Sequence, residues 1–329
     1  MEAVDPLTAR IEAEGAFLRD LRREMERVIV GQEELIDSLL MALLADGHLL
    51  LEGLPGLAKS LAVESMARAI GGSFRRIQFT PDLLPSDLLG THVYHPESGA
   101  WTIREGPVFS NFLLADEINR APAKVQSALL EAMQERQVSL AGDTRALPSP
   151  FLVLATQNPV ELEGTYSLPE AQVDRFMLKV LVSHPTREEE AEIMERMATH
   201  SGAPKPQVVA SPEQILQARS LMDEILLAPA ARQYILDLVF ATREPGAANL
   251  AELEPLLLYG ASPRATLALA QASRAHAFLR GRAYVTPQDI KQVAPAVMRH
   301  RLVPTYEAEA EGVSVEDMVQ RILDTVPVP

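Results

Sequence analysis

The chain of 329 residues contains no cysteine and carries far more acidic than basic side chains. Without cysteine it can form neither a disulfide nor a thiolate metal site; this fits a reducing compartment, and we expect a cytoplasmic protein. A net charge of −15 gives no general attraction for nucleic acid phosphates. The densest group of arginines, in residues 19–27, alternates with acids as on a solvated helix face. We therefore expect no nucleic acid partner.

Long apolar runs and a secretory signal are also missing. The longest apolar region, Leu39 to Leu51, is interrupted by Asp46 and His48 and is too short to span a bilayer. The first residues show neither a basic stretch nor an apolar one, so we expect no signal peptide and no membrane segment. A hydrophobic content of 47% and a charged content of 23% are those of an ordinary globular protein, and the length suits two domains.

The segment from Gly53 to Ser60 reads Gly-Leu-Pro-Gly-Leu-Ala-Lys-Ser and joins an apolar run to a helical pattern. This order predicts a phosphate-binding loop between a buried strand and a helix N-terminus. Lys59 would reach the β- and γ-phosphates, and the Ser60 hydroxyl would ligate Mg²⁺. Ala58 stands where the pattern has its second fixed glycine, and alanine suits that place only if its φ is negative. The alternative is a strand–helix turn that binds no ligand.

Two adjacent acids follow a second apolar strand, at Asp116 and Glu117. A buried parallel strand that ends in carboxylates puts charge at the edge of the sheet where α/β proteins bind ligands. Because alternate side chains point in opposite directions along a strand, the two acids can serve different purposes. Asp116 would hold the Mg²⁺ shell and Glu117 would polarise the attacking water as general base. The alternative is an acidic helix start that complements the helix dipole.

Three further places could bind nucleotide. Asn158 leaves the predicted strand 151–156 and could reach a γ-phosphate or its water, although Asn-Pro is also an ordinary turn. Arg264 lies in the first turn of a helix that Ser262 caps, where a cation is unfavourable unless an anion is near. The turn at 28–32, which contains Gly31, could pack an adenine ring, or could simply join two helices.

Strands alternate with helices from residue 47 to 183, which predicts an α/β fold with a parallel, helix-covered sheet. From Thr186 onward we expect only helices, so the predicted domains are a nucleotide-binding core at 1–185 and an all-helical domain at 186–329. Two hairpins, at 83–106 and 137–150, interrupt the core. The pair His92 and His95 lacks the further ligands that a zinc site needs, and we expect no metal there. The predicted helices of the second domain cover 187–200, 211–227, 229–243, 264–280 and 287–299.

Five motifs together closely resemble the MoxR family of AAA+ ATPases, over nearly the whole chain. They are Gly53 to Ser60, Leu113 to Arg120 (Leu-Leu-Ala-Asp-Glu-Ile-Asn-Arg), Ala155 to Pro159 (Ala-Thr-Gln-Asn-Pro), Leu168 to Phe176 (Leu-Pro-Glu-Ala-Gln-Val-Asp-Arg-Phe) and Gly260 to Arg264 (Gly-Ala-Ser-Pro-Arg). Alanine before the loop lysine is usual in that family.

The resemblance implies a role for each motif. The first motif would be Walker A, Asp116 and Glu117 would be Walker B, and Asn158 would be sensor 1. Arg175 resembles the arginine finger that one subunit offers to its neighbour, and Arg264 resembles sensor 2. The two hairpins match the helix-2 insert and the pre-sensor-1 hairpin of the same clade. The implied nucleotide-binding residues are Gly31, Gly53, Pro55, Gly56, Leu57, Ala58, Lys59, Ser60 and Leu61.

The resemblance also implies an activity: Mg²⁺-dependent ATP hydrolysis by a ring, of six subunits as in the family, that remodels, matures or activates protein complexes. A partner with a von Willebrand factor A domain is common in that family. One alternative is a motor that acts on nucleic acid, because relatives with the same inserts move DNA; the acidic balance argues against it. The other is a nucleotide-sensing scaffold, which is disfavoured because Lys59, Asp116, Glu117, Asn158 and Arg175 are all present.

Overall fold

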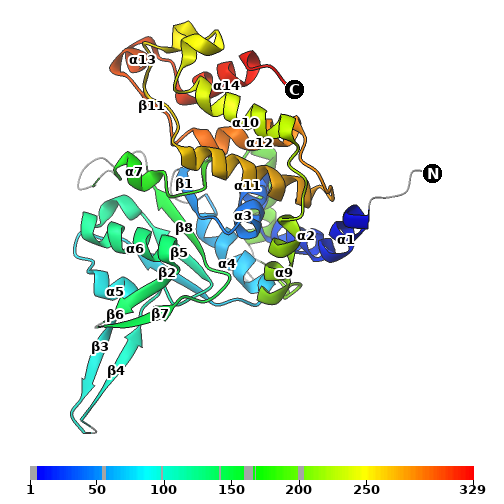
Figure 1. Ribbon diagram of the computed structural model, residues 1–329. Helices are drawn as coiled ribbons and strands as arrows, with labels where there is room; N and C mark the ends of the chain where they lie inside the picture. The colour runs from blue at the N-terminus through cyan, green and yellow to red at the C-terminus, as the bar shows by residue number, and fades with distance from the viewer. Residues whose placement is uncertain are drawn as a thin grey trace. The chain divides into compact units, whose positions relative to one another are not determined.

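A five-stranded sheet forms the centre of the predicted core (Figure 1). The structure is a computed structural model, and it describes residues 6–53, 57–97, 99–140, 142–158, 166, 168–198 and 204–329. The strand order is β2-β5-β8-β1-β9, and the pairs β2–β5, β5–β8 and β8–β1 are parallel, as predicted. The strands are β1 (Leu49–Gly53), β2 (Phe74–Gln78), β5 (Phe112–Asp116), β8 (Leu152–Gln157) and β9 (Leu178–Val182).

The inner strands are covered on both faces. Every residue of β5 from Phe112 to Ala115 is buried, and so is every residue of β8 from Leu152 to Thr156. Such continuous apolar strands are typical of a parallel sheet between helices. The helices of this part are α2 (Ala16–Val28), α3 (Glu33–Leu44), α4 (Lys59–Ile70), α5 (Pro85–Leu89), α6 (Ala123–Glu135), α7 (Glu170–Val173) and α8 (Arg187–Met197), with a 3₁₀ turn η1 at Ile118–Arg120.

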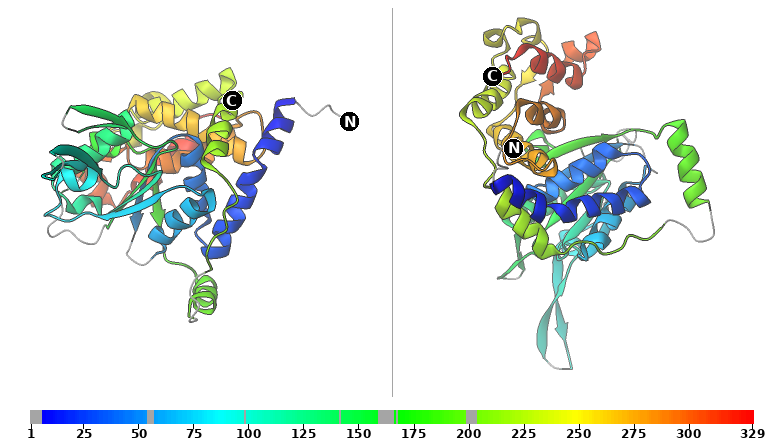
Figure 2. Two further views of the ribbon diagram at one scale, coloured as in Figure 1. Left: turned by 90° about the horizontal axis from the view of Figure 1, so that it is seen from below. Right: turned by 90° about the vertical axis from the view of Figure 1, so that its right-hand side faces the viewer.

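Two antiparallel hairpins are added to this core. One pairs β3 (Gly90–His95) with β4 (Ala100–Glu105), and the other pairs β6 (Gln137–Leu140) with β7 (Asp143–Ala146). Both lie within the ranges predicted from the sequence. The β3–β4 hairpin extends away from the sheet as a long two-stranded ribbon (Figure 2).

The chain divides into two compact units that interleave along the sequence. One contains Phe17–Arg175 and Val180–Leu216; the other contains the described residues up to Ala16, Phe176–Lys179 and Gln217–Pro329. Helix α8, which we expected in the helical domain, thus belongs to the unit of the sheet, and α1 (Pro6–Glu14) belongs to the other unit. The domain bounds at residue 185 stay a prediction.

The second unit is mainly helical, with α10 (Pro229–Ala241), α11 (Pro263–Leu279), α12 (Pro287–Met298), α13 (Tyr306–Glu311) and α14 (Val315–Thr325). The short helical turns η2 (Pro245–Ala248) and η3 (Ala251–Leu253) follow α10. The prediction of helices alone was wrong in one detail, because β10 (Leu257–Tyr259) pairs with β11 (Val303–Pro304). Helix α9 (Pro212–Met222), which spans both units, ends earlier than predicted because the Leu226 backbone bonds instead to Ala283 and Val285.

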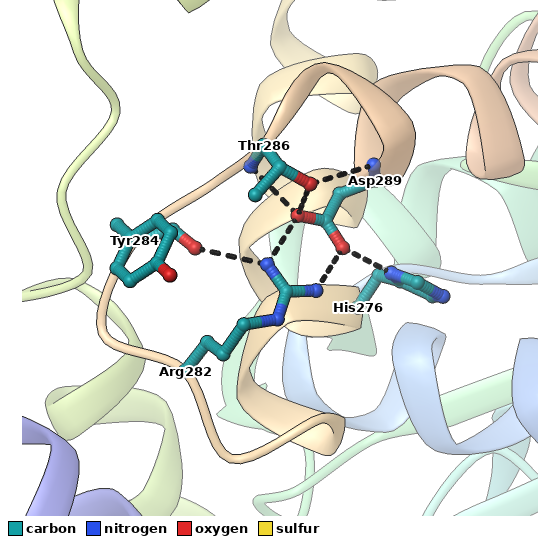
Figure 3. A network of polar contacts seen from close by, with 5 residues as sticks. All are labelled: His276, Arg282, Tyr284, Thr286 and Asp289. Carbon is teal, nitrogen blue, oxygen red and sulfur yellow. Dashed lines mark hydrogen bonds and ion pairs between the residues drawn. The ribbon is translucent and has the colours of Figure 1, made fainter.

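A buried carboxylate ties the α11–α12 connection together (Figure 3). The Asp289 side chain is 1% exposed and accepts hydrogen bonds from Arg282 at 2.5 and 2.7 Å. It also bonds His276 Nδ1 at 2.6 Å and the Thr286 hydroxyl at 2.6 Å. Burial alone would raise the pKa of Asp289, but the hydrogen bonds from Arg282, His276 and Thr286 hold this pKa well below the ordinary carboxyl value.

This network supports a stability prediction. Asp289→Asn removes the charge that satisfies Arg282, and we expect the free energy of unfolding to fall by about 3 kcal/mol at neutral pH. The pKa of Asp289 is lower in the folded protein than in the unfolded chain, where it is about 4. The network therefore stabilises the folded state at pH values above about 4, and this stabilisation is lost as the pH falls below that value. Thermal melts of the parent and the variant should therefore differ clearly at pH 7 and less at about pH 3. Asp237→Asn, at an exposed position of α10, is the matched control, and an equal loss in both variants would contradict the prediction.

Candidate functional site

A cavity of about 410 Å³ opens at the carboxyl edge of the sheet. It brings together side chains that follow β1, β5 and β8, which is where parallel α/β sheets bind ligands. Of the predicted site residues it contains the loop residues from Leu57 to Leu61, both acids and the asparagine. The residues that line it are Leu57, Ala58, Lys59, Ser60, Leu61, Arg76, Gln78, Asp116, Glu117, Thr156, Gln157 and Asn158.

The phosphate loop begins at Gly53, the last residue of β1, and α4 begins at Lys59. Predicted binding residues Pro55 and Gly56 lie outside the described part of the chain. The condition of a negative φ at Ala58 is not met: Ala58 has φ +56° and ψ +12°, in the left-handed region. This conformation costs an L-residue roughly 1–2 kcal/mol, so the backbone is locally strained where the loop meets α4.

Lys59 lies inside this cavity at the first turn of α4. Its Nζ atom donates to the Gly53 carbonyl at 2.6 Å. Burial lowers the pKa of Lys59 below its ordinary value, and the nearby charges of Asp116 and Glu117 oppose this shift. The ammonium group is therefore held partly out of water beside two carboxylates, where a phosphate can replace the carbonyl as its partner.

Both acids face the same cavity, although adjacent residues of a strand point in opposite directions. Glu117 lies beyond the end of β5 and has φ +56°, so the backbone turns there and the strand alternation no longer applies. Thr156, which is 1% exposed, fixes the turn. Its hydroxyl donates to Asp116 Oδ1 at 2.6 Å and accepts from the Glu117 N–H at 2.8 Å.

Strand β2 supplies contacts that the sequence reasoning missed. Gln78 Nε2 donates to Glu117 Oε2 at 2.6 Å, and Arg76 Nη2 donates to Asp116 Oδ2 at 2.6 Å. Arg120 adds an ion pair to Glu117, with Nε 3.2 Å from Oε2. The residues Arg76 and Gln78 are exposed on β2 and Ile77 between them is buried, but only the register of β2 beside β5, with Gln78 opposite Asp116, shows what the polar side chains touch.

A second, apolar cavity of about 240 Å³ lies beside the phosphate loop. Gly31 shapes the turn next to it with φ +65°, and a Cβ there would lie 2.5 Å from Glu189 Oε1. The turn is also held by Gln32 Nε2, which donates to the Ser183 carbonyl at 3.0 Å. An apolar cavity thus lies at the turn of residues 28–32, and its use for an adenine ring stays a prediction. Its lining residues are Val28, Ile29, Val30, Gln32, Leu57, Ala58, Leu61, Pro185, Ile193 and Met197.

The two predicted arginines do not line either cavity. Arg175 follows α7, is partly exposed, and its buried Nε atom has no hydrogen-bond partner among the described residues. Arg264 lies in the first turn of α11, where Ser262 caps the helix by accepting from the Arg264 N–H at 3.1 Å and Pro263 takes the first position, as predicted. The roles of Arg175 and Arg264 stay predictions.

The histidines of the β3–β4 hairpin contact other residues of the same hairpin. His95 Nε2 bonds the Thr102 hydroxyl at 2.7 Å, and the His92 ring lies 6.3 Å from the ring of Trp101. Across the described ranges, no group of three or more histidine or acidic residues could hold a metal ion.

Comparison with known proteins identifies the family. Residues 48–178 match the ATPase family associated with various cellular activities (AAA), and residues 252–322 match the AAA lid domain. The chain is 51% identical over 306 residues to the protein named chaperone MoxR1 of Mycobacterium tuberculosis. The aligned region covers 93% of this chain and 81% of that protein. The chain belongs to the MoxR family of AAA+ ATPases.

Two further relatives agree with this assignment. Protein MoxR of Methylorubrum extorquens is 33% identical over 341 residues, covering 93% of this chain and 94% of that protein. A crystal structure from Cytophaga hutchinsonii, described as a candidate ATPase, superposes with a TM-score of 0.92 at 46% identity and covers 98% of this chain and 97% of that one. This MoxR protein is thus an ATPase with an AAA+ core and a helical lid. None of its described helices is both long and apolar enough to cross a bilayer.

The cavity also has the chemistry that Mg²⁺ requires. Magnesium prefers oxygen ligands and usually binds through one or two side chains together with substrate phosphates. The Ser60 hydroxyl and the Asp116 carboxylate line one cavity with Lys59, whose charge suits a phosphate. The residues present therefore fit a nucleotide with its metal ion.

Proposed function

We propose that this ATPase hydrolyses Mg²⁺-ATP in the 410 Å³ cavity and, as a ring, uses the energy for chaperone-like remodelling of protein clients. The observation that carries the chemistry is the meeting of Lys59, Asp116 and Glu117 in one cavity. Ser60 and Asp116 would hold Mg²⁺, which supplies charge stabilisation for the transferring phosphoryl group when bound. The adenine ring would occupy the apolar cavity beside Gly31.

Each residue then has a separate task. Lys59 leaves the Gly53 carbonyl and binds the phosphates, and Asn158 orients the attacking water from the end of β8. Glu117 takes the proton of that water as general base, once its carboxylate has left Gln78. Because Gln78 and Arg120 both hold Glu117 by polar contacts, the base has to change partners before it acts. This gives the fold a way to delay hydrolysis.

A ring is proposed because Arg175 lines neither cavity of its own chain. An arginine that completes the site of a neighbouring subunit makes turnover depend on assembly. The hexameric ring and a partner with a von Willebrand factor A domain rest on the family resemblance. The MoxR1 relative carries the name chaperone, which supports a protein client.

The β3–β4 hairpin is the proposed client contact. Trp101 is 64% exposed and Tyr94 is 48% exposed, and their rings pack with centroids 5.1 Å apart. Exposed aromatic side chains can bury a protein surface at a small cost in side-chain entropy. The charges of the hairpin, Glu97, Arg104 and Glu105, are few and mixed, which suits a protein better than a nucleic acid backbone.

Removing these two rings tests the assignment. In the double variant Tyr94→Ser with Trp101→Ser, we expect assembly and basal ATPase to stay within about twofold of the parent, because the hairpin lies away from the cavity. Client-stimulated hydrolysis should be lost. The matched control is Val93→Ser with Thr102→Ser, a cross-strand pair next along the same ribbon. Basal activity that collapses together with assembly would make the hairpin structural, and tight, salt-dependent DNA binding through it would refute the protein client.

A further inference from the structure

Arg76 holds one of the two carboxylates of the ATP site from a neighbouring strand. Its Nη2 atom lies 2.6 Å from Asp116 Oδ2, while Asp116 Oδ1 accepts the hydroxyl of Thr156 at 2.6 Å. Both oxygens of the carboxylate are therefore engaged. Arg76 is positioned by the sheet rather than by a loop, because β2 pairs with β5 in register, with Arg76 opposite Leu114 and Gln78 opposite Asp116.

The same carboxylate is the one that the proposed function assigns to Mg²⁺. A guanidinium and a divalent cation that approach one carboxylate repel each other, so each weakens the attraction between the other cation and that carboxylate. Asp116 is 16% exposed and Arg76 is 53% exposed, so the carboxylate is largely shielded from water whereas the arginine has room to move into solvent. Exchange of the two cations therefore displaces an exposed side chain and leaves the buried partner, Thr156, in place.

We propose that Arg76 competes with Mg²⁺ for Asp116 and so sets the metal concentration at which this site is filled. The inference rests on the proposed Mg²⁺-ATP function and adds a residue that restrains metal binding. In this role Arg76 keeps the carboxylate neutralised and correctly turned, and it releases Oδ2 when the metal ion arrives together with nucleotide.

A second contact extends the effect to the general base. Arg76 Nη2 also lies 3.4 Å from Gln78 Oε1, and Gln78 Nε2 donates to Glu117 Oε2 at 2.6 Å. Departure of Arg76 from Asp116 removes a hydrogen-bond partner of the Gln78 amide, which is the group that restrains Glu117. Metal binding at one acid is thereby linked to the release of the other acid.

Metal titration of the full chain tests this proposal. We would follow Mn²⁺ binding by electron paramagnetic resonance in the presence of a non-hydrolysable ATP analogue, so that the readout does not depend on turnover. In Arg76→Gln the half-saturating Mn²⁺ concentration should fall about fivefold, which corresponds to about 1 kcal/mol for a partly exposed ion pair. Arg76→Ser, a second neutral variant, should give the same shift.

Two variants serve as controls. Arg75→Gln removes the same charge from the adjacent, exposed position of β2, and its half-saturating Mn²⁺ concentration should equal that of the parent. Arg76→Lys keeps the charge and should stay within about twofold of the parent, because the competition is electrostatic. Equal melting temperatures for the parent and Arg76→Gln show that the fold is retained.

The outcomes separate the two proposals. Tighter Mn²⁺ binding in both neutral Arg76 variants, but not in Arg75→Gln, supports the competition. Unchanged or weaker Mn²⁺ binding in Arg76→Gln overturns it and leaves the ATPase function intact. Failure of the parent itself to bind Mn²⁺ with the nucleotide analogue would refute the proposed Mg²⁺ dependence instead.

Discussion

Replacing Glu117 with glutamine lowers the rate of ATP hydrolysis by about 10²–10⁴-fold while ATP still binds. The amide of glutamine cannot accept the proton of the attacking water, but it keeps the size of the side chain and leaves Lys59 and Ser60 in place. Lys59→Ala should instead bind ATP poorly, because it removes the one lysine among the described residues that line the cavity. Phosphate release and equilibrium binding of a fluorescent ATP analogue measure the two effects separately.

A matched control is available on α6. Glu131 is exposed there, and Glu131→Gln removes the same charge with no expected change in rate or binding. Hydrolysis by Glu117→Gln at close to the parent rate would show that another group acts as general base.

Replacing Arg175 with alanine should reduce turnover by about 10³-fold or more while ATP binding stays nearly unchanged. The reason is that Arg175 lines neither of the two cavities of its own chain, so its guanidinium would act on the phosphate of a neighbour. Steady-state hydrolysis and nucleotide binding of the purified variant test this directly.

Mixed assemblies distinguish action on a neighbour from action within one chain. Subunits with Arg175→Ala retain an intact Glu117, and subunits with Glu117→Gln retain an intact Arg175. In a ring that contains both, some interfaces combine the two intact groups, so partial activity should return. If assemblies are shown to contain both kinds of subunit and remain inactive, Arg175 does not act on the site of a neighbouring subunit.

The parallel sheet could be predicted because its inner strands are continuous apolar runs separated by helices. Phe112–Asp116 and Leu152–Gln157 are such runs, and the structure places them side by side. The β10–β11 pair could not be predicted in the same way. It joins residues 257–259 to residues 303–304, two short segments without strand periodicity that are brought together by the packing of the helices between them.

The candidate site shows a similar division between local and tertiary information. Lys59, Ser60, Asp116, Glu117 and Asn158 could be named because each follows a strand or opens a helix in a recognisable order. Arg76 and Gln78 could not, since their contacts depend on which strand lies beside β5. The left-handed turns at Ala58 and Glu117 were also missed, because residue type alone favours a negative φ at both positions.

The most direct test of the account is a crystal structure of the Glu117→Gln variant with ATP and Mg²⁺. The account predicts the γ-phosphate within hydrogen-bond distance of Lys59, the metal ion at Ser60 and Asp116, and the adenine ring in the apolar cavity between Val28 and Met197. It also predicts that Arg76 no longer contacts Asp116. A nucleotide bound elsewhere, or a metal ion held by other side chains, would contradict the assignment of this cavity as the ATPase site.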